Sequence, residues 1–128
     1  MEEKQRVLLI EDEELIAKAY KEGLERGGIE VIIALDGVIG LEELRKNKYD
    51  LVLLDLIMPR KDGFTVLEEM KQDEDLKEMP VMILTVSGAD TSMIRAKKLG
   101  AIDYLVKTDY SMKEVVERVR FRLGFSGE

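Results

Sequence analysis

The chain has 128 residues and a formal net charge of −7 at pH 7, which is enough sequence for one domain that folds without cross-links. It contains no cysteine and no histidine, so disulfides, thiolate metal sites, Ser-His-Asp triads and a phosphohistidine carrier role are excluded. The 27 acidic residues against 20 basic ones argue against direct nucleic-acid binding.

Apolar runs and helical periodicity alternate along the whole chain. Short apolar runs predict strands over residues 7–10, 29–33, 51–54, 81–84 and 101–106. Between and after them, apolar residues at helical spacing predict helices over residues 15–24, 38–44, 64–70, 93–98 and 115–123. Each predicted strand is therefore followed by a predicted helix.

Polar and small residues mark where these elements end. The Gly27-Gly28 pair is expected to end the first helix, and the Asp36-Gly37 pair predicts a turn. Residues 111–114, Ser-Met-Lys-Glu, have the spacing of a capping box at the start of the last helix.

Five strand–helix units in strict alternation predict an α/β fold. Buried parallel strands covered by helices on both sides give a three-layer sandwich, and right-handed crossovers favour a flavodoxin-like (βα)5 fold with sheet order 2-1-3-4-5. We expect one domain over residues 5–124, frayed ends at 1–4 and 125–128, and no output domain.

Polar residues gather at the carboxyl ends of the predicted strands, where open α/β sheets bind their ligands. Strands one, three, four and five are neighbours in the predicted order. Their carboxyl ends carry Glu11, Asp12, Asp55, Thr85 and Lys107. Helix capping, loop capping, a hydroxyl bonded to nearby backbone and a surface lysine are the ordinary interpretations. A single shared site explains all five positions together.

Three carboxylates at one sheet edge repel each other, and a divalent cation with oxygen ligands relieves that repulsion. Mg²⁺ fits such a site best, and Mn²⁺ is the alternative. Three carboxylates, one Mg²⁺ and one lysine sum to zero charge, so the filled site would accept a phosphoryl group.

Three strings carry a resemblance to a known family. They are VLLIED at 7–12, DLVLLDLIMP at 50–59 with Gly63 following, and YLVK at 104–107. In this order, over residues 5–124, they resemble the receiver domain of two-component response regulators.

This resemblance implies a signalling role rather than an enzyme acting on other substrates. Asp55 would be the phosphoacceptor, taking the phosphoryl group from a sensor histidine kinase or a histidine phosphotransfer protein. Lys107 would pair with Asp55 and then with a phosphoryl oxygen, Thr85 would bind the phosphoryl group, and Tyr104 would be the aromatic switch residue. The downstream protein target stays unknown.

The resemblance also implies the metal ligands. Asp12 would bind Mg²⁺ directly, Glu11 directly or through water, and the backbone carbonyl of Ile57 would complete the protein ligands. The family commonly has aspartate where this chain has Glu11.

Thr108 is a second departure, since the family usually has proline after the lysine, often with a cis bond. A cis bond before threonine costs about 2.5–4 kcal/mol, so we expect a trans bond.

Other interpretations fit less well. A haloacid-dehalogenase-type phosphatase needs a second acid where Ile57 stands, dinucleotide binding needs a G-x-G-x-x-G triple that is absent, and the acidic residues after the first strand disfavour a flavin. An unphosphorylated pseudo-receiver, or protein-interaction module, stays open. With no apolar run near the roughly 20 residues of a membrane span and no signal peptide, we expect a cytoplasmic protein without membrane contact.

Overall fold

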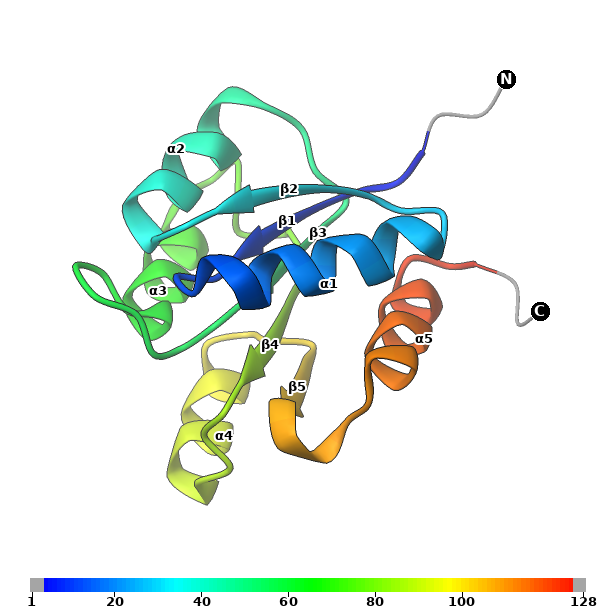
Figure 1. Ribbon diagram of the computed structural model, residues 1–128. Helices are drawn as coiled ribbons and strands as arrows, with labels where there is room; N and C mark the ends of the chain where they lie inside the picture. The colour runs from blue at the N-terminus through cyan, green and yellow to red at the C-terminus, as the bar shows by residue number, and fades with distance from the viewer. Residues whose placement is uncertain (1–3, 126–128) are drawn as a thin grey trace.

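The computed structural model describes residues 4–125 (Figure 1). Its strands are β1 Arg6–Ile10, β2 Glu30–Ala34, β3 Leu51–Leu54, β4 Val81–Thr85 and β5 Asp103–Val106. Its helices are α1 Glu14–Arg26, α2 Gly37–Lys46, α3 Gly63–Gln72, α4 Asp90–Lys98 and α5 Met112–Arg122, with a short 3-10 helix η1 Lys107–Asp109. The expectation of frayed ends concerns mainly residues outside this range.

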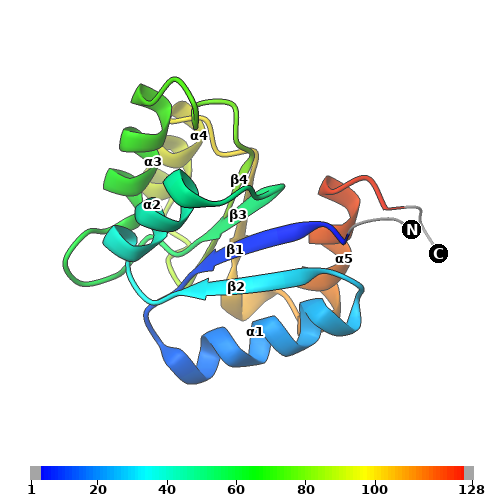
Figure 2. The same cartoon turned by 90° about the horizontal axis from the view of Figure 1, so that it is seen from above.

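The strands form one parallel sheet in the order β2-β1-β3-β4-β5, which confirms the predicted flavodoxin-like topology. Helices α1 and α5 cover one face of this sheet and α2, α3 and α4 cover the other (Figure 2). None of the helices in the described range is long and apolar enough to cross a membrane.

Alternate residues of the central strands pack into separate cores on the two faces. Leu8 and Ile10 of β1 belong to the core beneath α2, α3 and α4, whereas Val7 and Leu9 belong to the core beneath α1 and α5. Both faces of β1 are therefore covered by helices, and the register pairs its last residue, Ile10, with Leu54 of β3. The carboxyl ends of the strands are thereby brought level at one edge.

Two local predictions are corrected by the structure. Asp36 and Gly37 do not form a free turn, because the Asp36 side chain accepts a hydrogen bond from Ile39 N at 2.9 Å and caps the start of α2. Strand β5 begins at Asp103 rather than at residue 101, because Ala101 N still bonds to Ala96 O and completes the end of α4.

Other local signals are confirmed. Gly27 caps α1 and Gly28 follows with a φ of 90°. Ser111 and Glu114 form the reciprocal bonds of a capping box at the start of α5.

Gly63 brings the start of α3 against the end of β3. Its N–H donates to Leu56 O at 3.0 Å. A Cβ at this position would collide with the Asp55 carbonyl oxygen and lie 2.7 Å from the Leu56 Cα. Both are backbone atoms, so a side chain here would displace the segment that carries Asp55.

We therefore predict that Gly63→Ala destabilises the fold by about 1–3 kcal/mol, the usual cost of overpacking. Urea unfolding measures the change. The matched control is Gly88→Ala, where an added Cβ meets only Val106 methyls at 3.7 and 3.9 Å, and its stability should stay within about 0.5 kcal/mol of the parent. Equal unfolding midpoints for the two variants would contradict the close approach.

Candidate functional site

Three carboxylates meet at the carboxyl-terminal edge of the sheet. Glu11 and Asp12 follow β1, and Asp55 follows the neighbouring strand β3. The ladder hydrogen bonds continue past the strands, since Glu11 N donates to Ala34 O and Asp55 N donates to Ile10 O, each at 3.0 Å. One oxygen from each carboxylate lies within 4.8 Å of the other two. The predicted cluster of acids is therefore formed.

Lys107, at the start of η1, connects two of these acids. Its Nζ donates to Glu11 Oε1 and, at 3.3 Å, to Asp55 Oδ2. Glu11 is 1% exposed and Asp55 is 6% exposed. Buried charges of this kind are tolerated only when they are paired and hydrogen-bonded, and Lys107 supplies that pairing.

Backbone amides bind the second carboxylate oxygen of Glu11 and of Asp55. Glu11 Oε2 accepts from Glu13 N at 3.0 Å, and Asp55 Oδ1 accepts from Ile57 N at 3.2 Å. Both side chains are thus oriented before any ligand arrives.

The electrostatics of the cluster follow from its burial. Burial raises the pKa of the Glu11 carboxyl and outweighs the hydrogen bond from Lys107. Burial alone would lower the pKa of Lys107, but the hydrogen bond to Glu11 and the negative charge of Asp55 raise it. The lysine is therefore held in its charged form.

With all groups ionised, three carboxylates and one ammonium leave two negative charges uncompensated. Carboxylate oxygens are the ligands that hard divalent cations prefer. The residues present therefore fit a divalent cation.

Thr85 ends β4, the strand next to β3. Its side chain is fully buried, and its Oγ1 has no hydrogen-bond partner among the described residues. The ordinary interpretation, a hydroxyl bonded to nearby backbone, is therefore wrong. A buried hydroxyl left unpaired costs about 1–3 kcal/mol, and a ligand at this edge of the sheet could supply the missing bond.

Tyr104 lies on β5, beside Ile83 of β4. The residue is buried, with 7% of its surface exposed. Its hydroxyl donates to Ser87 O at 2.7 Å, which ties β5 to the segment between β4 and α4.

Two features were not predicted from the sequence. The bond between Lys107 and Glu11 was missed because only Asp55 was expected as the partner of that lysine. Tyr20 of α1 was assigned only to an apolar helix stripe. It is 9% exposed, and burial raises the pKa of its hydroxyl. The positive charge of Lys107 opposes this rise, and the negative charge of Glu11 adds to it. No sequence signal separates such a tyrosine from an ordinary core residue.

The backbone after Lys107 accommodates Thr108 without a cis peptide bond. No cis peptide bond occurs within residues 4–125, so the bond between Lys107 and Thr108 is trans, as expected. Residues 107–109 form η1 directly after β5, and this turn leaves the lysine side chain directed at the carboxylates.

Known proteins share both the sequence pattern and the fold. The family model of the response regulator receiver domain matches residues 7–120. The transcriptional regulatory protein RprY of Bacteroides fragilis is 37% identical over 119 residues, which are 93% of this chain and 49% of RprY. The chain spans about half the length of the curated relatives it matches.

Solved structures extend the likeness. The receiver domain of the Francisella response regulator 1452 is 31% identical, with a TM-score of 0.85 and coverage of 94% of this chain and 97% of that one. The Mn²⁺-bound form of response regulator Rcp1 is 32% identical, with a TM-score of 0.85 and coverage of 95% and 96%.

The raised pKa of Glu11 predicts a pH-dependent cost of burying it. A folded-state pKa above the unfolded value means that Glu11 keeps its proton to higher pH in the folded chain than in the unfolded chain. The free energy of unfolding therefore falls as the pH rises from the unfolded pKa towards the folded one. Without metal, the stability of Glu11→Gln relative to the parent should therefore increase as the pH rises above the ordinary glutamate pKa of about 4.3. Chemical denaturation at several pH values measures it. The exposed Glu22→Gln control should follow the parent, and a relative stability of Glu11→Gln that is independent of pH would contradict the expectation.

Proposed function

The chain belongs to the response regulator receiver domain family, and we propose that Asp55 is its phosphoacceptor in a reaction that depends on a divalent cation. The observation that carries this proposal is the cluster of buried Glu11, half-buried Asp12 and buried Asp55, with Lys107 bonded to two of its members. Asp55 lies at the centre of these contacts, between the strand ends that carry the other acids and the lysine.

The proposed donor is a phosphohistidine on a sensor histidine kinase or a histidine phosphotransfer protein. An Asp55 oxygen attacks phosphorus, a P–O bond forms while the P–N bond breaks, and the imidazole nitrogen keeps the electron pair. Since these 128 residues contain no histidine, the donor histidine lies outside them. Bonds from Ile57 N and Lys107 fix the orientation of the Asp55 carboxylate, which is the positioning that phosphoryl transfer requires.

Glu11, Asp12, Asp55 and the Ile57 carbonyl would hold the cation, for which we propose Mg²⁺, with Mn²⁺ as the alternative. When bound, it would neutralise the two remaining negative charges and stabilise charge on the transferring group. Since Lys107 and Glu13 N already occupy the Glu11 oxygens, we propose contact through water for Glu11. The Mn²⁺-bound form of Rcp1 supports this cation chemistry by similarity.

Lys107 and Thr85 would receive the phosphoryl oxygens. The unpaired Thr85 hydroxyl gains a partner if it moves towards the phosphoryl group. Because Thr85 leads directly into the segment whose Ser87 carbonyl binds Tyr104, that movement would alter the Tyr104 bond. Phosphorylation then biases an existing equilibrium, as expected of a switch.

The surroundings of the acidic cluster favour a protein donor. Five exposed apolar side chains follow the ends of four strands, either in the connection or in the first turn of the next helix, at the same edge as the carboxylates. They are Leu15, Leu35, Ile39, Ile57 and Val86. An exposed apolar rim around a charged centre is typical of a protein-binding surface, and we propose that the kinase or phosphotransfer protein docks on it.

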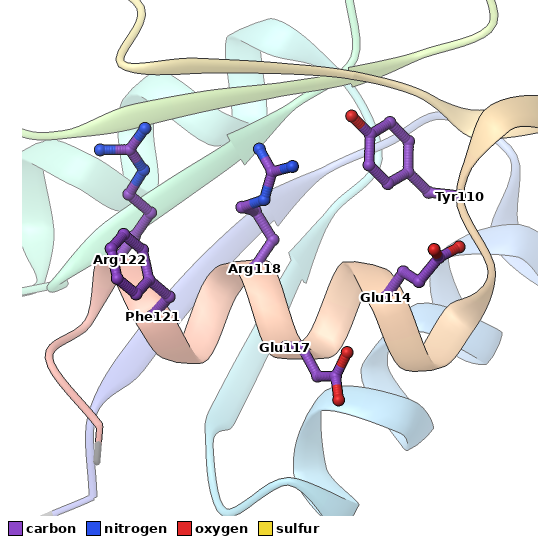
Figure 3. A pocket seen from close by; sticks show the side chains of 6 residues that line it. All are labelled: Tyr110, Glu114, Glu117, Arg118, Phe121 and Arg122. Atoms are coloured by element: carbon purple, nitrogen blue, oxygen red, sulfur yellow. The ribbon is translucent and has the colours of Figure 1, made fainter. Parts of the chain in front are cut away.

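A second surface lies on α5, on a different side of the molecule. A cavity of about 400 Å³ is lined by residues of α5 and by Tyr110 (Figure 3). Arg118 contacts Asp103 of β5 at 2.9 and 3.0 Å. Although burial opposes it, this contact lowers the pKa of Asp103. We propose this α5–β5 surface as the one that a downstream protein senses.

Acetyl phosphate with Mg²⁺ tests the phosphoacceptor assignment without a kinase. The parent should gain one phosphoryl group by intact-protein mass spectrometry, and chelation of Mg²⁺ should prevent the gain. Asp55→Asn keeps the side-chain size, loses the nucleophilic charge and should gain none. A similar gain in the Asn variant would refute the assignment, and an unphosphorylated interaction module would show no gain in the parent either.

Thr85→Val should lose the response to a phosphoryl analogue without losing the stability of the unphosphorylated protein. Replacing the unpaired hydroxyl by a methyl of similar shape should leave the unphosphorylated protein as stable as the parent, or more stable by about 1 kcal/mol. Beryllofluoride with Mg²⁺ should raise the melting temperature of the parent more than that of Thr85→Val. Thr85→Ser, which keeps the hydroxyl, should respond like the parent. An equal shift in the Val variant would argue against a Thr85–phosphoryl bond.

Ile57 should slow hydrolysis of the phosphorylated form. Its side chain is 56% exposed in the segment after Asp55, and it has no donor or acceptor that could orient an attacking water. Decay of the phosphorylated protein after donor removal should therefore be faster for Ile57→Asn than for the parent. Equal or slower decay in the Asn variant would refute this role, and Ile57→Val is the control that should decay like the parent.

A further inference from the structure

Arg60 has an unusual backbone conformation in the segment between β3 and α3. Its φ is 66°, and it is the only non-glycine residue with positive φ within residues 4–125. This left-handed region favours glycine, because other L-residues are crowded there. A residue with such strain persists where a contact in the surrounding structure holds it in place.

That contact is an ion pair with Asp36. Arg60 Nη1 donates to Asp36 Oδ2 at 2.8 Å, and the Asp36 side chain is only 9% exposed. The other oxygen, Asp36 Oδ1, accepts from Ile39 N and fixes Asp36 at the start of α2. Asp36 is therefore anchored by a second hydrogen bond, whereas the Arg60 side chain is 60% exposed.

The ion pair joins two loops that flank the acidic cluster. Asp36 follows β2 and Arg60 follows β3, and these strands lie on either side of β1, whose end carries Glu11 and Asp12. The backbones also approach closely, since a Cβ on Gly37 would lie 2.7 Å from Lys61 O. The segment from Ile57 to Asp62 is thus held against the start of α2.

We propose that Arg60 is a positioning residue for the cation site, holding the β3–α3 segment so that the Ile57 backbone stays beside the carboxylates. This inference rests on the proposed function, which gives the Ile57 carbonyl to the cation. The segment is fixed near its ends by the bonds from Ile57 N to Asp55 Oδ1 and from Gly63 N to Leu56 O. The Arg60–Asp36 ion pair is the contact that fixes its middle to another loop.

The direction in which the cation affinity changes when Arg60 is replaced distinguishes a positioning role from a simple effect of its charge. Removing a positive charge from this loop should, by electrostatics alone, strengthen the binding of a cation. Loss of positioning should weaken it. Lys61 provides the matched control, because it pairs with Glu69 of α3, the helix that follows directly, and it carries the same charge in the same loop.

The experiment compares Mg²⁺ affinity by calorimetry with amide hydrogen exchange of residues 57–63 measured without metal. Arg60→Gln should bind Mg²⁺ about fivefold more weakly than the parent, and the loop amides should exchange faster. Lys61→Gln should bind at least as tightly as the parent. Arg60→Lys, which keeps a charged donor, should recover part of the affinity.

Asp36→Asn tests the other partner, because an asparagine oxygen can still cap α2 while the ion pair is lost. If the two residues act together, adding Arg60→Gln to Asp36→Asn should cause no further loss of affinity. Arg60→Gln with unchanged or tighter Mg²⁺ binding and unchanged exchange would overturn the inference. If the parent itself does not bind Mg²⁺, the proposed function fails, and unchanged exchange in Arg60→Gln would then separately overturn the role of Arg60.

Discussion

The confinement of three carboxylates and one lysine at a single sheet edge is the constraint on which the site depends. Glu11 and Asp55 are buried at the ends of adjacent strands, and Lys107 reaches both of them from the end of β5. The lysine neutralises one of the three negative charges, which lets the buried carboxylates stay ionised. Two negative charges are still uncompensated. This imbalance favours a cation, and we propose that the cluster accepts a phosphoryl group once the cation has neutralised it.

The rest of the fold supports this arrangement. Apolar residues on both faces of β1 and β3 bury these strands in the middle of the sheet, and the register, which pairs Ile10 with Leu54, brings Glu11 and Asp55 to the same level. Gly63 allows α3 to begin against the Asp55 backbone. Thr85, with its unpaired hydroxyl, and Tyr104, bonded to Ser87, connect the same edge to the α4–β5 side of the molecule.

The sequence predicted the fold and most of the cluster because both depend on strong local patterns. Apolar runs bounded by polar residues place strand ends within a residue or two, and the parallel order places those ends side by side. The start of β5 was missed because residues 101 and 102 are apolar, although Ala101 N still bonds to Ala96 O and completes the end of α4. Asp36 was assigned to a turn because Asp-Gly is typical of turns as well as of helix starts.

Long-range side-chain pairing was beyond the reach of sequence patterns. Lys107 and Glu11 are 96 positions apart, and Arg60 and Asp36 are 24 apart. Nothing in the local sequence says which acid a given cation will contact. The left-handed conformation of Arg60 was equally hidden, since this backbone region is usually occupied by glycine.

A crystal structure of the protein with Mn²⁺ and beryllofluoride would test the central claim most directly, because the anomalous signal of Mn²⁺ locates the cation. We expect the metal among oxygens of Glu11, Asp12 and Asp55 and the Ile57 carbonyl, directly or through water. Beryllofluoride should lie on Asp55, within reach of Lys107 and Thr85. Mn²⁺ bound elsewhere, with Asp55 unmodified and Lys107 still paired with Glu11, would contradict the account.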